Sequence, residues 1–159
     1  MIHLRLSVPE DAFALNLRPE DQAEVDLSHP AGGHPAYLAE HLAGHDVSLT
    51  ALDAAGRVVA VGGLTRGTIP NGPAYVSPWL LCSSLIGEHR ATAWRRTRAL
   101  VANLQAEADR GTMVCNHVSK DATAARAFLA RLGFLIVPSV GPFDFFYLPG
   151  AAPCANPQP

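Results

Sequence analysis

The sequence lacks a long apolar run, a large charge of one sign and a paired set of cysteines. No apolar stretch reaches the roughly 20 residues that cross a lipid bilayer, so we expect no membrane-spanning segment. Twelve basic and 14 acidic side chains give a formal net charge of −2, which supplies no electrostatic attraction for nucleic acid. Neither nucleic acid nor membrane is therefore an expected partner.

Cysteine is scarce. The sequence has three, an odd number that cannot all pair in disulfides, and their spacing is not that of a metal site: Cys82, Cys115 and Cys154. Two of them lie in apolar runs, where a buried and reduced thiol is typical. The first residues, Met1 to Arg5, do not have the basic and apolar regions of a signal peptide. These features predict a protein of the cytoplasm.

Apolar residues are plentiful. They make up 48% of the 159 residues and charged residues only 16%, a composition that argues against general disorder. A chain of this length has the size of one domain. We therefore predict a single domain over 1–148 and a disordered tail over 149–159, which consists mostly of Ala, Pro, Asn and Gln.

Hydrophobic periodicity predicts the order of strands and helices. Strands are expected at 2–8, 47–52, 57–64, 74–82, 112–118, 134–137 and 143–148. Helices are expected from about Pro9, again from 18–21, and at 36–43, 89–109 and 121–132. Pro78 interrupts the fourth strand and indicates a bulge or an unpaired edge. This order predicts α and β layers around one mixed sheet.

Several segments resemble a known family. Leu-Ala-Arg-Leu-Gly-Phe at 129–134 resembles the helix end and sixth strand of the GNAT N-acetyltransferase superfamily. Pro-Trp-Leu-Leu at 78–81 and the block at 116–134 resemble a narrower group, the acetyltransferase-like internal virion proteins of tailed bacteriophages. Arg18 and Asp21 match the Arg-x-x-Asp that often opens the first helices. The resemblance is strongest in the second half. It implies an α/β (α+β) fold with a mixed, mostly antiparallel sheet that splays between its fourth and fifth strands.

The resemblance also implies that the cofactor is acetyl-CoA, held by backbone N–H groups at the start of the helix at 89–109. Such groups form a good anion site. The residues expected to bind the pyrophosphate are Ser83, Ser84, Gly87, Glu88, His89 and Arg90. The superfamily's Gln/Arg-x-x-Gly-x-Gly/Ala pattern is not present, and Glu88 adds negative charge. A plain strand-to-helix connection is therefore the alternative.

Acetyl transfer requires a polarised thioester carbonyl and a deprotonated amine. The resemblance implies that backbone N–H groups near Leu80, Leu81 and Cys82 hold the carbonyl, and that Asn116 lines the pantetheine arm. A polar residue that merely ends a strand is the alternative for Asn116. His117 is the nearest titratable group and the candidate base, although strand alternation turns it to the face opposite Asn116.

Two residues depart from the superfamily. Where the superfamily usually has a tyrosine that acts as the general acid, this sequence has Leu129, and leucine cannot donate a proton. Where the superfamily often has an asparagine, this sequence has Ala122. Two functions therefore stay open. One is an N-acyltransferase that acetylates an amine of a small molecule or a protein. The other is a phage or prophage protein with this fold, a structural or interaction role and weak or lost catalysis, placed in the host cytoplasm or the virion.

Two further features of the sequence concern a metal site and a dimer. His41 and His45 are one helical turn apart but lack a third ligand nearby, so no metal site is expected. The apolar strand at 143–148 lies near the chain end, and a homodimer through it is one further expectation.

Overall fold

The computed structural model describes residues 2–30, 33–44 and 47–150 and builds them around one seven-stranded sheet. The strands are β1 (His3–Leu6), β2 (Val47–Leu52), β3 (Val58–Thr68), β4 (Ala74–Cys82), β5 (Met113–Ser119), β6 (Leu135–Val137) and β7 (Phe143–Leu148). The helices are α1 (Glu10–Ala14), α2 (Pro19–Ser28), α3 (Ala36–Gly44), α4 (Arg90–Ala108) and α5 (Thr123–Arg131), with a 3-10 helix, η1 (Ser84–His89), before α4. This confirms the predicted mixed α+β fold.

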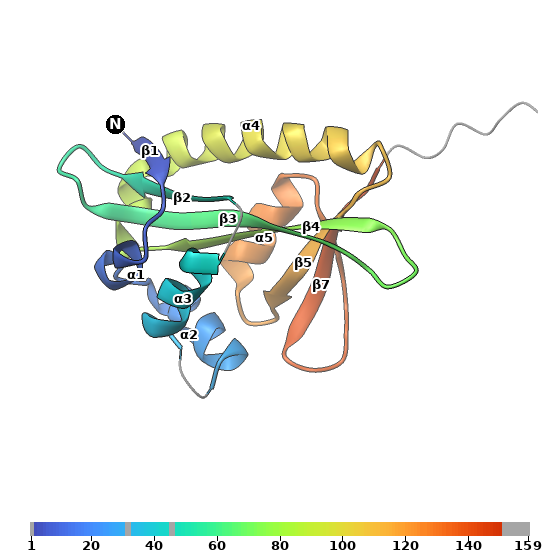
Figure 1. Cartoon of the computed structure of the whole chain (residues 1–159), viewed down its shortest axis with the longest axis horizontal. Helices are drawn as coiled ribbons and strands as arrows, with labels where there is room; N and C mark the ends of the chain where they lie inside the picture. The colour runs from blue at the N-terminus through green and yellow to red at the C-terminus, as the bar shows by residue number, and fades with distance from the viewer. Residues whose placement is uncertain (1, 31–32, 45–46, 151–159) are drawn as a thin grey trace, which may run out of the picture.

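The strand order is β1-β2-β3-β4-β5-β7-β6, and of these neighbours only β4 and β5 run parallel. In Figure 1, β5 and β7 run steeply away from the direction of β3 and β4. The parallel ladder is accordingly short, with only Tyr75–Met113 and Val76–Val114 paired. The sheet thus divides into two halves that stay joined at one end.

Helices cover the two faces of the sheet (Figure 1). On one face, Val101 and Leu104 of α4 pack against Val76 and Val114, and we call it the α4 face. On the other, the α1 face, α1, α2 and α3 pack residues such as Leu15 against Val61. Each face has a separate apolar core, which fits the two-sided burial of a central sheet.

The structure lengthens one predicted strand. The expected end near Leu64 was too early, because β3 continues to Thr68 and pairs with Ala74. Gly67 lies inside this strand, opposite Tyr75 of β4. A Cβ atom there would lie 2.6 Å from the ring of Tyr75.

The homodimer through the last strand stays a prediction, and the structure shows that this strand is not at an edge of the sheet. β7 lies between β5 and β6, and β6 pairs with it over Phe145 to Tyr147, so this backbone edge is occupied. The single-domain boundary stays a prediction. Pro149 accepts a hydrogen bond from Gln105 of α4 at 2.7 Å, and residues 151–159 of the predicted tail, with Cys154, lie outside the described residues. Within the described ranges, no helix has the length and apolarity to cross a bilayer.

Candidate functional site

Beyond the Val76–Val114 pair, β4 and β5 separate, and we call the gap between them the fork. Asn116 of β5 reaches across its start: the side-chain amide donates to the carbonyl of Pro78 at 3.0 Å. The same side chain accepts the backbone N–H of His117 at 2.8 Å. Pro78 has no N–H, so it leaves no donor unpaired on the strand edge where the ladder ends. The proline that interrupts the strand pattern thus lies where the sheet opens.

The three β4 residues expected at the thioester carbonyl point in different directions. A strand residue sends its N–H and C=O to the same neighbour, and successive residues alternate. The carbonyls of Pro78 and Cys82 are bonded on the fork side, by Asn116 and by the backbone N–H of Arg18. Leu80, between them, therefore also presents its N–H to the fork, whereas Leu81 faces β3.

Cys82 does not offer its N–H to a ligand in this structure. That N–H donates to the Asp21 carboxylate at 2.6 Å in a buried contact. Burial raises the pKa of the Cys82 thiol to about 12, and the negative charge of Asp21 acts in the same direction. The thiol is thus a neutral packing group, and of the three predicted residues Leu80 is best placed to bind a carbonyl.

The start of α2 closes the far end of the fork. Asp21 is only 6% exposed and pairs with Arg18 at 2.8 Å. One helical turn later, the carboxylate of Glu24 lies near the backbone N–H of Ser119, at the end of β5, which partly offsets the rise that burial causes in the pKa of Glu24. Asp21 therefore holds the end of β4, and Glu24 lies beside the end of β5.

Both carboxylates have shifted pKa values. Burial raises the pKa of Asp21 and outweighs the opposing effect of Arg18. Burial also raises the pKa of Glu24, and the nearby charge of Asp21 adds to the rise. The Arg-x-x-Asp pattern drew attention to Asp21, but Glu24 was missed. The sequence did contain one signal for Glu24: it follows Asp21 by three residues, a spacing that places both side chains on the same face of a helix.

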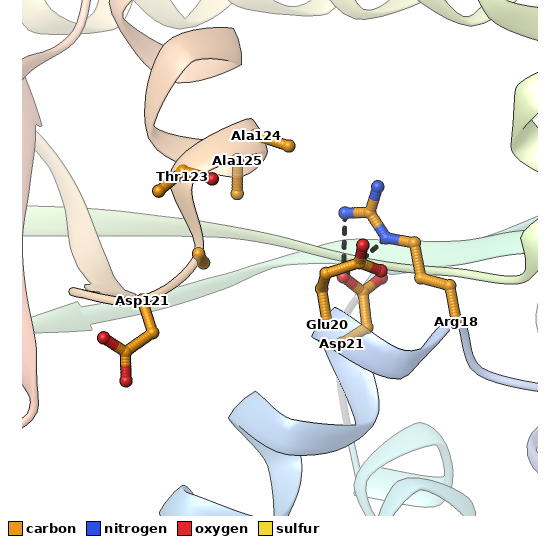
Figure 2. A pocket seen from close by; sticks show the side chains of 8 residues that line it. Arg18, Glu20, Asp21, Asp121, Thr123, Ala124 and Ala125 are labelled. Atoms are coloured by element: carbon orange, nitrogen blue, oxygen red, sulfur yellow. Dashed lines mark hydrogen bonds and ion pairs between the residues drawn. The ribbon is translucent and has the colours of Figure 1, made fainter.

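A small pocket separates α2 from the start of α5. Figure 2 shows the Arg18–Asp21 pair and Glu20 on one side and Asp121, Thr123, Ala124 and Ala125 on the other. Ala122, where the superfamily often has asparagine, is buried there. Leu129 is partly buried and packs against the core of the α4 face. In this structure, both residues that differ from the superfamily, Ala122 and Leu129, therefore pack in apolar surroundings.

The predicted phosphate-binding segment is a 3-10 helix, η1, rather than an open loop. Ser83 is buried, and its hydroxyl donates to the carbonyl of Val59 at 3.0 Å, so this hydroxyl has a structural role. Glu88 is turned toward Arg57, with 3.9 Å between the charged atoms. A Cβ atom on Gly87 would meet nothing within 4 Å. Ser84, Gly87 and Arg90 are exposed.

The start of α4 retains features of an anion site. His89 occupies the N-cap position, and its side chain makes no capping hydrogen bond. The first N–H groups of a helix have no partner within the helix itself, and here η1 leads directly into them. Further along α4, Trp94 contacts Phe128 at 5.6 Å and lies under Arg131 at 4.7 Å, which packs α4 against α5.

A second hollow, of about 220 Å³, opens on the α1 face beside the fork. It is lined by Tyr75, Ser77, Met113, Cys115, His117 and Phe145, together with Ile69 and Asn116. We call it the aromatic hollow. The alternation of side chains along β5 directs His117 away from the α4 face, as expected. This direction places His117 in the aromatic hollow. Asn116 and His117 are therefore brought together at one site.

The described residues contain no group of three His, Cys, Asp or Glu side chains able to hold a metal ion. His45, one of the two histidines considered for such a site, lies outside the described residues. His41 instead packs edge-on against Trp79, with 5.0 Å between ring centroids.

Comparisons with known proteins rest on structure alone, since no protein-family model and no curated protein matches the sequence. The ribosomal-protein-S18-alanine N-acetyltransferase of Escherichia coli superposes with a TM-score of 0.58 at 13% identity, over 98% of this chain and 99% of that chain. A GCN5-related N-acetyltransferase of Kribbella flavida gives 0.56 at 19% identity, over 93% and 97%. The chain has the GNAT fold.

A third structure of the GNAT fold is a phosphinothricin acetyltransferase of Sinorhizobium meliloti in complex with AcCoA. It superposes with a TM-score of 0.55 at 15% identity, over 94% of this chain and 90% of that chain. The similarity of all three spans nearly the whole chain, including the first helices, where the sequence resemblance was weakest. At these identities the comparisons establish the architecture.

Proposed function

We propose that this protein is an acetyl-CoA-dependent N-acetyltransferase that acetylates an amine. The observation that carries the proposal is the fork, where Leu80 presents a backbone N–H at the point at which β4 loses its partner. The exposed Gly87 and the start of α4 would lie beside the phosphates of the cofactor. A neighbour with the same fold was solved with AcCoA.

Bound acetyl-CoA would supply an acetyl thioester. Residues of the chain would then stabilise the acyl oxygen, position the cofactor and accept the proton of the amine. The N–H of Leu80 would hydrogen-bond the acyl oxygen and stabilise the negative charge that develops there. The amide of Asn116 can exchange its bond with Pro78 for one to the cofactor arm. An imidazole nitrogen of His117 would take the proton from the acceptor amine.

Calorimetric titration of the full chain with acetyl-CoA tests the proposal. We expect saturable binding, together with a rise in melting temperature that grows with ligand concentration. Replacing Gly87 with Glu should weaken binding at least tenfold, because it adds a charge at the phosphate site. Gly87→Ala is the matched control and should bind normally, since a Cβ atom meets no neighbour there. The absence of heat and of any thermal shift at millimolar ligand would rule out the enzyme.

The second candidate is a phage or prophage protein with the GNAT fold and a structural or interaction role. Leu129 and Ala122 favour it, because both occupy positions of polar residues in the superfamily and both pack in apolar surroundings. This candidate predicts a stable protein that binds acetyl-CoA weakly or not at all. The same titration therefore distinguishes the two functions.

A further inference from the structure

The aromatic hollow lies where an acceptor amine would approach the fork. Tyr75 and Ser77 come from β4, and Met113, Cys115 and His117 come from β5, on either side of the point where the strands separate. Asn116 lines the hollow and also bonds to Pro78 at the fork. The hollow therefore borders the start of the fork on the α1 face.

The lining of this hollow is poor in charge. Its described residues include no Asp, Glu, Lys or Arg, and His117 is the one basic side chain among them. Burial raises the pKa of the Cys115 thiol, which keeps that group neutral. A carboxylate, a phosphate or a second ammonium group on the acceptor would lose water there without gaining a counter-charge. Polyamines, amino acids and phosphorylated amines are therefore poor fits.

Aromatic rings form two walls of the hollow. Phe145 contacts His117 edge-on, with 5.5 Å between ring centroids, and stacks with Tyr147 at 6.2 Å. The ring of Tyr75 lies so close to Gly67 that no Cβ would fit between them. Such rings favour another ring edge-to-face or offset, and they also attract an ammonium group. The chemistry of the walls therefore matches an aromatic amine.

The size of the hollow suits a small ligand. Its 220 Å³ is somewhat larger than the cavity of about 150 Å³ that accommodates benzene in an engineered protein core. One ring with a short side chain therefore fits in this space.

We propose that the hollow binds a primary amine carried by a short chain on a single aromatic ring, that is, a small arylalkylamine. This inference rests on the proposed acetyltransferase function. The amine nitrogen forms a bond to the acetyl carbon of acetyl-CoA, and the carbon–sulfur bond breaks with its electron pair on sulfur. The proton lost from nitrogen passes through His117 and ends on the thiol, so the products are an N-acetylarylalkylamine and free coenzyme A.

The test follows thiol release by the full chain with acetyl-CoA and a set of amines. We expect kcat/KM for 2-phenylethylamine to exceed that for spermidine or glycine at least tenfold. Ser77→Phe should fill the hollow and raise KM for 2-phenylethylamine at least tenfold, with an unchanged Kd for acetyl-CoA. Ala74→Phe, on the same strand but the opposite face, is the matched control and should leave both constants unchanged.

A second variant and a second readout keep the test decisive if Ser77→Phe folds poorly. Phe145→Ala should weaken the saturation-transfer NMR signal of 2-phenylethylamine, which needs no turnover. A protein that acetylates spermidine or glycine in preference to arylalkylamines would overturn this inference and leave the acetyltransferase intact. Failure to bind acetyl-CoA would instead overturn the proposed function itself.

Discussion

The carboxylate of Asp21 accepts the backbone N–H of Cys82 at 2.6 Å, from a position 61 residues earlier in the chain. In a complete sheet, a partner strand would bond this N–H. The splay of β5 removes that strand, and the side chain of α2 takes its place. The fork is thus closed at its far end by a helix, α2, that takes the place of the missing ladder.

Removal of this carboxylate should destabilise the protein. Asp21→Ala leaves the Cys82 N–H and the Arg18 guanidinium without their partner in a buried place, which we expect to cost about 1–3 kcal/mol. Urea denaturation measures the difference. Asp26→Asn, on the exposed side of the same helix, is the control and should change the free energy of unfolding by less than about 0.5 kcal/mol. Equal losses in the two variants would contradict the role assigned to Asp21.

Glu24 should make stability depend on pH. Its pKa is higher in the folded state than in the unfolded chain because burial disfavours the charged form. The ionised carboxylate therefore costs stability above the folded pKa, and this cost disappears as the pH falls below the unfolded value of about 4.3. Glu24→Gln, which keeps an oxygen for Ser119, should be more stable than wild type at pH 7 and equal to it near pH 4.

Urea melts of Glu24→Gln at both pH values test this sign. Glu40→Gln, at an exposed site on α3, controls for the loss of one negative charge. A gain that persists at pH 4, or one that Glu40→Gln reproduces, would show that burial of Glu24 is not the cause.

A buried polar network joins α1 to the sheet. The fully buried Thr50 donates its hydroxyl to Asp11 at 2.6 Å, and Arg5 pairs with the same carboxylate. Burial raises the pKa of Asp11, but hydrogen bonds from Arg5, Thr50 and the Val8 N–H outweigh it and hold the pKa below its ordinary value. This carboxylate therefore stabilises the fold above its unfolded pKa of about 3.9, and the contribution is lost as the pH falls through the folded value.

Thr50→Val retains the shape of the side chain and removes its hydrogen bond to a charged partner. We expect a loss of about 1.5–3 kcal/mol at pH 7, measured by urea denaturation, and a smaller loss once Asp11 is protonated. Thr68→Val, at the exposed end of β3, should have little effect. An equal loss at pH 7 and at a pH below the lowered pKa of Asp11 would argue against the role of the Asp11 charge.

Leu80 provides a test of catalysis. Because its N–H faces the fork and not β3, Leu80→Pro removes that donor without breaking a bond of the β3–β4 ladder. We expect kcat to fall about 100- to 1000-fold, as when one oxyanion donor is lost, with little change in the Kd for acetyl-CoA. Leu80→Ala retains the N–H and should keep most of the activity. Circular dichroism checks that the proline variant is folded, and normal turnover in that variant would exclude Leu80 from the mechanism.

The local pattern of the sequence was enough to predict the order of the elements. Alternation in the strands, helical spacing in α4 and α5, and the glycines that end them all act over a few residues, so they can be read without a structure. Pro78 belongs to the same class. A residue without an N–H cannot donate to a strand on that side, and the sheet does open beside it toward β5.

Only the tertiary structure decided what the site consists of. Asp21 meets Cys82, Glu24 lies near Ser119, and Tyr75 and His117 line one hollow, through the meeting of distant segments that no local pattern encodes. Which of Leu80, Leu81 and Cys82 has an N–H directed to the fork likewise depended on the register against β3. Local periodicity fixes which residues form a strand, but the neighbour that each backbone group bonds is set by how the strands come together.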